Sequence, residues 1–257
     1  MNIKQNIIQK LVTTETNYNV KIILAIESGS RASGFAAKNA DYDCRFIYVH
    51  PQDWYLSIQE RKDFITYAID EIYDIKGIDI SRALQYIIKP NASIYEWLSS
   101  NITYICNKSI TNQLQTLATN FFNPISISYH YLYLARKTLN DITNSKEAKI
   151  KKYFYTLRPI ANLNYIWQHR KMPSMEYAQT LKNIETPPQI LSAINTLTQE
   201  KMLAGEHDKI PKHELLISYC QKEVEKFTDN IKTMTHTKNR DYEFVDTIFR
   251  DIIVQAW

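Results

Sequence analysis

Two acidic residues separated by one position follow a glycine-serine turn in the N-terminal part of this chain. Gly29-Ser30 comes after the apolar run Val20–Ile26, and Asp41 and Asp43 precede a second apolar run, Cys44–Val49. Successive residues of a strand point to opposite faces, so Asp41 and Asp43 are expected to point the same way. Neighbouring carboxylates repel unless a cation lies between them, and Mg²⁺ binds few carboxylates and completes its shell with water and phosphate oxygens. The spacing therefore predicts a metal-dependent phosphoryl-transfer site.

The turn supplies groups that could hold phosphates. Gly29 allows close approach of the backbone to a ligand, and Ser30 offers a hydroxyl and an amide N–H. A short helix over residues 30–38 would add its free amides, and Arg31 could add a charge-assisted contact. The alternative is a strand–turn–helix–strand unit whose acids are only a polar strand start. The Gly-Ser turn between two apolar strands favours the nucleotide site.

A third carboxylate on a neighbouring strand would complete such a site and help to activate the attacking hydroxyl. Asp74 lies near the end of an expected strand over residues 71–76, while Asp79 precedes an expected helix over residues 81–89. Asp79 suits the role of helix N-cap, so Asp74 is the preferred ligand and Asp79 the alternative. Glu71 is a weaker candidate that suits a solvated strand residue.

Basic and aromatic residues in the C-terminal half could grip a triphosphate, which needs cations opposite the metal. The candidates are His130, Arg136, Lys137, Lys152, Tyr155 and Arg158. Lys152 and Tyr155 share a helix face at this spacing, and Tyr155 could stack on a base. The alternative is a solvated basic helix face.

Gly29-Ser30, the gap of ten residues and Asp41-Tyr42-Asp43 resemble the DNA polymerase beta-like nucleotidyltransferase superfamily. Longer stretches are similar to the bacterial and phage family of predicted nucleotidyltransferases associated with RNA ligases and RNA repair. These stretches are Glu27–Ala32, Asp41–Val49, Trp54–Ser57, Asp74–Asp79, Tyr129–Tyr131 and Lys151–Pro159. The resemblance favours Lys152 and Arg158 as ligand-facing residues. Ile78 departs from it, because the family usually has tryptophan there.

The resemblance implies transfer of a nucleoside monophosphate from a nucleoside triphosphate, such as ATP, to an acceptor hydroxyl with release of pyrophosphate (EC 2.7.7 type). Asp41 and Asp43 would hold two divalent cations, Mg²⁺ or Mn²⁺, and Asp74 would complete the metal near the acceptor. The expected acceptor is an RNA end, with an RNA ligase or another protein as a possible partner. Alternatives are nucleotidylation of a protein, such as the partner of a toxin, or of a small molecule. A different class is a non-catalytic nucleotide- or RNA-binding module.

Apolar periodicity predicts an α+β fold in which a mixed sheet with helices is followed by a mostly helical part. A helix is expected over residues 2–17, strands over 20–26, 41–49 and 64–69, and mainly helices over 110–257. We expect a nucleotidyltransferase catalytic domain over 1–110 and a helical domain over 111–257 that closes the nucleotide cleft.

Composition is that of a globular protein with mild positive charge. The chain has 257 residues, 44% of them hydrophobic, and a formal net charge of +4, which is compatible with a phosphate-rich ligand. Its 3 cysteines are too widely spaced for a zinc site or a disulfide framework. No run of residues has the character of a signal peptide or a membrane span, so we expect a cytoplasmic protein without a membrane partner.

Overall fold

The fold is taken from a computed structural model that describes residues 2–69, 72–203, 208–236 and 241–257. Contacts divide the described residues into two compact units. The sheet unit draws on Met1–Ala32, Asp41–Phe122 and Lys238–Trp257, and the helical unit on Ser33–Ala40 and Asn123–Thr237. Among the described residues, no helix has the length and apolar character needed to cross a bilayer.

The sheet unit combines strands with helices. In chain order its elements are α1 (Ile3–Tyr18), β1 (Lys21–Glu27), α2 (Gly29–Ser33, whose last residue belongs to the helical unit), β2 (Tyr42–Val49), α3 (Gln52–Tyr55), β3 (Phe64–Ile69), β4 (Tyr73–Asp79), α4 (Ile80–Ile88), α5 (Ala92–Leu98), β5 (Thr103–Cys106), α6 (Lys108–Phe121) and α12 (Tyr242–Ala256).

The five strands form one mixed sheet in the order β3-β4-β2-β1-β5. β1 pairs antiparallel with β2 and β5, and β3 pairs antiparallel with β4. β2 and β4 are parallel neighbours, so their first residues lie at the same edge of the sheet. This pairing decides where the acidic residues meet.

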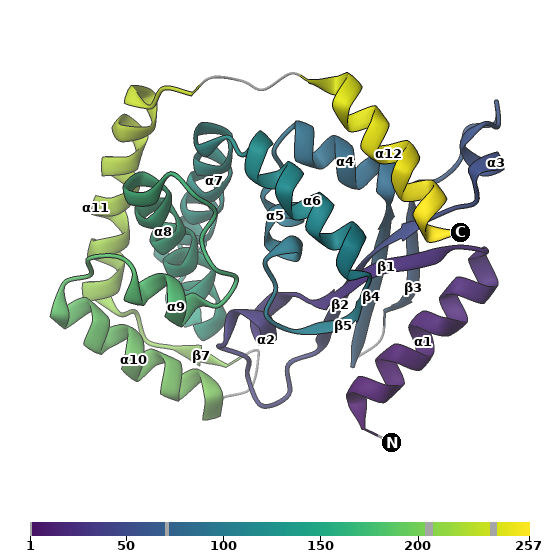
Figure 1. Ribbon diagram of the computed structural model, residues 1–257. Coiled ribbons are helices and arrows are strands. Elements are labelled where there is room, and N and C mark those ends of the chain that lie inside the picture. The colour runs from purple at the N-terminus through teal and green to yellow at the C-terminus, as the bar shows by residue number, and fades with distance from the viewer. Residues whose placement is uncertain (1, 70–71, 204–207, 237–240) are drawn as a thin grey trace. The chain divides into compact units, whose positions relative to one another are not determined.

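Helices cover both faces of the sheet (Figure 1). On one face, Ile7 and Leu11 of α1 pack with Cys44, Phe46 and Tyr48 of β2 in a buried cluster. Because strand residues alternate, the residues between these three face the other way. α4 and α6 contact the sheet, and α12 packs on α4 and α6.

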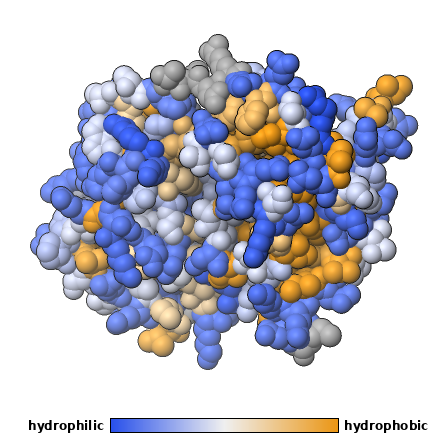
Figure 2. All heavy atoms as spheres, viewed as in Figure 1, coloured by the Kyte–Doolittle hydropathy of each residue, from blue (hydrophilic) through white to orange (hydrophobic). Residues whose placement is uncertain are grey.

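Hydrophobic side chains gather over α12 on the face drawn in Figure 2. Its exposed apolar residues are Tyr242, Phe244 and Val254. Buried Val245, Ile252 and Ile253 hold the helix against the rest of the sheet unit. The chain expected to be mainly helical over 110–257 thus ends in a helix, and contacts group this helix with the sheet.

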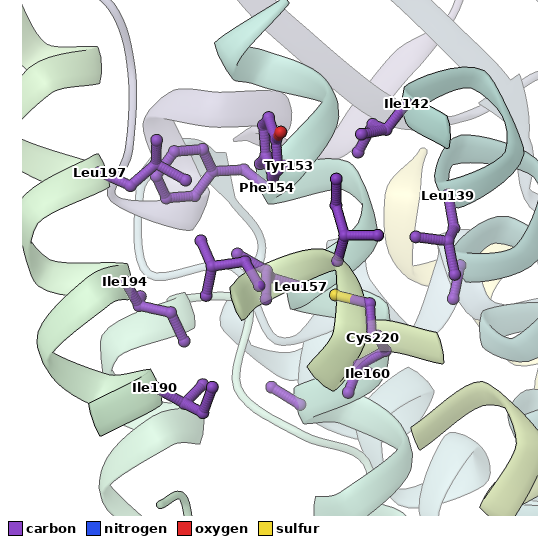
Figure 3. Packing of buried hydrophobic residues seen from close by; sticks show 14 of the residues in the cluster. Leu139, Ile142, Tyr153, Phe154, Leu157, Ile160, Ile190, Ile194, Leu197 and Cys220 are labelled. Atoms are coloured by element: carbon purple, nitrogen blue, oxygen red, sulfur yellow. The ribbon is translucent and has the colours of Figure 1, made fainter. Parts of the chain in front are cut away.

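The helical unit is built from α7 (Pro124–Thr143), β6 (Ala148–Lys149), α8 (Ile150–His169), α9 (Tyr177–Lys182), α10 (Pro188–Leu203), β7 (Lys209–Ile210), α11 (Glu214–Asn230) and the 3₁₀ turn η1 (Ile231–Thr233). Its core contains Leu139, Leu157, Ile194 and Cys220, drawn from four helices (Figure 3). Phe35, from the loop after α2, is buried in the same cluster and stacks on Phe154 at 4.8 Å between ring centroids.

Pro159 lies inside α8 without breaking it. Proline has no N–H to donate, so the carbonyl of Tyr155 loses its usual helical partner. The hydroxyl of Thr138 on α7 lies 3.1 Å from that carbonyl oxygen and 2.9 Å from the carbonyl oxygen of Leu134, and it accepts a hydrogen bond from the hydroxyl of Thr156. The neighbouring helix thus places a donor, shared between two acceptors, beside the carbonyl that proline leaves open.

The predicted α+β class is confirmed, with a mixed sheet followed by mostly helical chain. The short pairing of β6 with β7 was not expected. The functional domains 1–110 and 111–257, and the role of the second in closing a cleft, stay predictions. As compact units, the contacts group α6 and α12 with the sheet and residues 33–40 with the helices.

Gly77 of β4 leaves room for an aromatic ring of the neighbouring strand. A Cβ at this position would lie 2.1 Å from a ring carbon of Phe46, which is fully buried. We expect Gly77→Ala to lower the free energy of unfolding by about 2 kcal/mol, because overpacking in a core costs of that order. Urea unfolding followed by circular dichroism measures the loss.

The control is the double variant Phe46→Leu/Gly77→Ala, which restores space for the added methyl group. Its loss should be smaller than the sum of the losses of the two single variants. Additive losses would contradict the proposed clash.

Candidate active site

Parallel pairing of β2 with β4 builds a square of four charged side chains. Asp43 lies beside Asp74 in the register, and Arg45 lies beside Lys76. Residues two apart on a strand share a face, so all four side chains lie on the same face of the sheet. Two carboxylates and two cations are thus placed in contact at one edge.

Arg45 binds both carboxylates of this square. Its Nη2 donates to Oδ1 of Asp43 at 2.9 Å and to Oδ2 of Asp74 at 2.8 Å. Its Nη1 donates to the carbonyl oxygens of Cys44 at 3.0 Å and of Asp74 at 2.7 Å. The guanidinium is therefore fixed by four hydrogen bonds, and Arg45 is a site residue whose role the sequence reasoning missed.

Lys76 supplies the second cation. Its Nζ lies 3.0 Å from Oδ1 of Asp74 and donates to Oδ2 at 3.1 Å. Burial alone would raise the pKa of Asp74, but the bonds from Lys76 and Arg45 outweigh burial and hold that pKa below its usual value. Asp74 is thus held as a carboxylate by two cations.

Asp43 has the opposite balance. Burial raises the pKa of Asp43, Arg45 lowers it, and the charges of Asp41 and Asp74 raise it further. Repulsion among the three carboxylates is therefore compensated only in part by Arg45. An added cation would favour the charged form.

The Gly-Ser turn packs directly on Asp43. Gly29 has a φ of 59°, in the left-handed region that favours glycine, and a Cβ there would lie 2.0 Å from Oδ2 of Asp43. The amide of Ser28 also donates to the carbonyl of Asp43 at 2.8 Å. Gly29 thus lies against the Asp43 carboxylate, and Ser30 follows it in α2. Close approach of this turn to a phosphate stays a prediction.

Glu27, at the end of β1, binds the backbone of Asp43. It is 1% exposed, accepts the backbone N–H of Asp43 at 2.9 Å and accepts a hydrogen bond from the hydroxyl of Tyr104. Burial raises the pKa of Glu27 above its ordinary value, against the effect of these two bonds. The sequence places Glu27 two residues before Gly29, but only the pairing of β1 with β2 shows that Glu27 contacts Asp43.

Arg31 and Asp41 are linked through the backbone. The Arg31 Nε donates to the carbonyl of Asp41 at 2.9 Å, and its guanidinium carbon lies 3.8 Å from the centre of the Tyr42 ring. Asp41 lies one residue before β2 begins. Arg31 therefore fixes the chain at the first of the two acids.

The donor chemistry suits a hard divalent cation, since Asp41 and Asp43 offer carboxylate oxygens on either side of Tyr42. Two carboxylates are enough for Mg²⁺ when substrate phosphates and water complete its shell. Within the described part of the chain, no three His, Cys, Asp or Glu residues form a group that could hold a metal ion. Asp74 as a third metal ligand stays a prediction, with its oxygens now bound by Arg45 and Lys76.

Asp79 is a helix cap. Its Oδ1 accepts the Ser81 amide and hydroxyl, at 2.8 and 2.6 Å, and its Oδ2 accepts the Tyr55 hydroxyl at 2.8 Å. Both oxygens of the carboxylate thus accept hydrogen bonds at the start of α4, as the position of Asp79 before the helix indicated. Glu71, the weakest candidate, lies outside the described residues.

The nucleotide-binding candidates in the C-terminal half lie in the helical unit. Lys152 donates to Oδ2 of Asp141 at 2.8 Å, and Nη2 of Arg158 lies 3.7 Å from the sulfur of Met175. Tyr155 is 44% exposed, so its ring is accessible. The role of these three side chains in binding a nucleotide stays a prediction.

His130, Arg136 and Lys137 lie on α7 in the same unit. The guanidinium of Arg136 donates to the hydroxyl of Thr228 on α11, and the His130 ring packs against Tyr131 with centroids 5.6 Å apart. Lys137 is exposed. Arg136 thus has a structural contact, and a phosphate-binding role for the three stays a prediction.

The sequence of this chain matches a family of the polymerase beta-like class. Residues 3–251 match the RNA repair pathway DNA polymerase beta family, and the chain belongs to this family. It is 34% identical over 254 residues to the uncharacterized protein YcgL of Bacillus subtilis (strain 168), across 99% of this chain and 98% of that protein.

A solved structure, that of a nucleotidyltransferase-like protein from Exiguobacterium sibiricum 255-15, was also matched. The match has 10% identity, a TM-score of 0.31 and coverage of 88% of this chain and 75% of that one.

Gly29 and Gly34 provide a matched test of the contact between the turn and Asp43. Both have positive φ, but a Cβ on Gly34 would meet only Cγ of Glu176, at 3.6 Å. Alanine at either position costs about 1–2 kcal/mol for the left-handed backbone. Gly29→Ala must also displace the Asp43 carboxylate, so we expect it to lower the free energy of unfolding by at least about 1 kcal/mol more than Gly34→Ala does. Urea unfolding measures both, and equal losses would contradict the contact.

Glu27→Gln tests the buried carboxylate. A raised native pKa means that the native state holds the proton more tightly than the unfolded chain does, so ionisation of Glu27 costs stability as pH rises from about 4 through the native pKa. The stability of the variant relative to the wild type should therefore increase over that range and then level off. Urea unfolding between about pH 4 and pH 8 measures the difference. Glu60→Gln, at an exposed position, controls for the loss of one formal charge, and a pH-independent difference for Glu27→Gln would contradict the assignment.

Proposed function

We propose that this protein is a metal-dependent nucleotidyltransferase that moves a nucleoside monophosphate from a nucleoside triphosphate to an acceptor hydroxyl, with an RNA end as the acceptor. The observation that carries the proposal is the packing of the Gly29-Ser30 turn on the carboxylate of Asp43. A phosphate held by that turn would lie beside an acidic group suited to a divalent cation. Membership of the RNA repair pathway DNA polymerase beta family supports both the reaction class and the acceptor.

The reaction breaks a phosphoanhydride bond and forms a phosphoester bond. The acceptor oxygen bonds to the α-phosphorus while the bond from that phosphorus to the α–β bridging oxygen breaks. Its electron pair leaves with pyrophosphate, and the hydroxyl proton is released to solvent. Catalysis of such a transfer depends mainly on positioning and on electrostatic stabilisation of the phosphoryl oxygens.

The chain's own groups divide these tasks. In this proposal the Ser30 hydroxyl and the backbone amides of the turn bind the β- and γ-phosphates, and the Arg31 guanidinium adds positive charge. Asp41 and Asp43 hold Mg²⁺ or Mn²⁺, which when bound would polarise the phosphate and lower the pKa of an attacking hydroxyl. Glu27 keeps the Asp43 backbone in place through the hydrogen bond at 2.9 Å.

The helical unit offers candidates for the rest of the triphosphate. Arg158 and Tyr155 are proposed to contact phosphate and base, with Lys152 as a further cation that would have to leave Asp141. An RNA ligase that acts on the same ends is the partner that the family suggests. RNA binding through several phosphate contacts should weaken steeply with salt.

The two acids of the proposed metal site provide the direct test. We expect Asp41→Asn and Asp43→Asn each to reduce transfer at least about 100-fold, because even loss of a group behind a metal ligand costs 10–100-fold. The assay supplies each of the four α-labelled nucleoside triphosphates with Mg²⁺ or Mn²⁺ and a mixed pool of small RNAs. Asp53→Asn, at an exposed acid in α3, is the matched control and should keep full activity.

Label on RNA that depends on Asp41 and Asp43 would support the whole proposal. Label on protein or on a small molecule would keep the nucleotidyltransferase and replace the acceptor. Nucleotide binding without any transfer would contradict catalysis and favour a binding module.

A further inference from the structure

The position between Asp43 and Asp74 is already filled by a cation. Nη2 of Arg45 lies within 2.9 Å of one carboxylate and 2.8 Å of the other. The Arg45 side chain is 16% exposed, and those of Asp43 and Asp74 are 22% and 17% exposed. A divalent ion bridging the same two oxygens would occupy the volume of the guanidinium and would be repelled by it.

Arg45 is also firmly held in this position. Its second nitrogen, Nη1, is anchored by the carbonyl oxygens of Cys44 and Asp74. These carbonyls belong to neighbouring strands, Cys44 in β2 and Asp74 in β4, so the guanidinium is anchored to both strands of the parallel pair. A planar guanidinium that binds on several sides at once is more strongly oriented than an ammonium would be.

The two carboxylates differ in what remains open to a ligand. Both oxygens of Asp74 lie within 3.1 Å of a cationic nitrogen from Arg45 or Lys76. In Asp43, Arg45 takes Oδ1, whereas Oδ2 lies beside Gly29 on the side of the Gly-Ser turn. Asp43 therefore keeps an oxygen beside the turn that is proposed to bind phosphate. In the described part of the chain, Oδ1 of Asp74 is buried without a hydrogen bond and lies 3.0 Å from Nζ of Lys76.

We infer that Arg45 permanently takes the place of a second metal ion, so that the enzyme works with one divalent cation on Asp41 and Asp43. Asp74 is then a positioning residue that holds the Arg45 guanidinium, and Lys76 balances its remaining charge. This inference rests on the proposed function and makes it more specific, because it gives the number of metal ions and the role of the third carboxylate.

The test counts metal ions directly. Mn²⁺ is titrated into the full-length protein saturated with an α,β-methylene nucleoside triphosphate, and bound ions are counted from the loss of the free Mn²⁺ signal in electron paramagnetic resonance. We expect about one protein-dependent Mn²⁺ per chain in the wild type and about two in Arg45→Met, since removal of the guanidinium frees Oδ1 of Asp43 and takes away one of the two cations at Asp74. Arg45→Lys keeps a cation and should stay at the wild-type count.

Lys76→Met is the matched control. It removes the other cation that contacts Asp74 but leaves Arg45 between the carboxylates, so its count should remain that of the wild type. Circular dichroism reports whether each variant is folded. If Arg45→Met fails to fold, the wild-type count still decides the question.

Two ions in the wild type would overturn the inference while leaving the proposed function intact. A count that stays unchanged in folded Arg45→Met would overturn it as well, because the guanidinium would then not be what excludes the second ion. No bound ion in the wild type would remove both the inference and the proposed metal site. One ion in the wild type and two in Arg45→Met support the inference.

Discussion

The parallel pairing of β2 with β4 is the constraint on which the site depends. It places two aspartates side by side at the edge of the sheet, in register Asp43 with Asp74. Like charges in such positions destabilise a sheet unless they are compensated. The same register brings Arg45 beside Lys76 two residues further along. Arg45 of β2 pairs with the carboxylates of both strands, and Lys76 of β4 pairs with Asp74 of its own strand. The acidic site can therefore exist in the folded protein before any ligand binds.

The surroundings of Asp43 show how tightly one carboxylate can be fixed. Gly29 lies against its Oδ2, Arg45 binds its Oδ1, and Glu27 accepts its backbone N–H. These contacts come from β1, from the turn that follows it and from β2, so the geometry of the turn and of the strand depend on each other. Glu27 itself is buried at a cost, since its raised pKa shows that the protein disfavours its ionised form. A costly group next to a site residue is consistent with selection for the position of Asp43.

The sequence predicted the elements better than the contacts between them. Apolar runs identified β1 and β2, and the spacing of apolar residues identified α1, because both signals are local. Asp79 was correctly favoured as a cap, since capping also depends on adjacent residues. Arg45 and Lys76 received no role, because their function follows from the register of two strands separated by α3 and β3. The alternation of acid and base in Asp43-x-Arg45 and Asp74-x-Lys76 was visible, but without the pairing it indicates only polar strands. The contact between Lys152 and Asp141 was also missed, because it joins two helices, α8 and α7, and depends on how they pack.

Most of the ten residues between the Gly-Ser turn and Asp41 belong to the helical unit, which their spacing in the sequence does not reveal. Residues 33–40 group with the helical unit, and Phe35 is 2% exposed among its core residues. The chain thus leaves the sheet unit directly after Arg31-Ala32, contributes an aromatic ring to the second core, and returns at the first acid of the site. Arg31 donates a hydrogen bond to the carbonyl of Asp41, so the residues on either side of the segment 33–40 are linked to each other. The segment that connects Arg31-Ala32 to Asp41 is therefore part of the helical unit, in which Phe35 packs with Phe154 and Leu157.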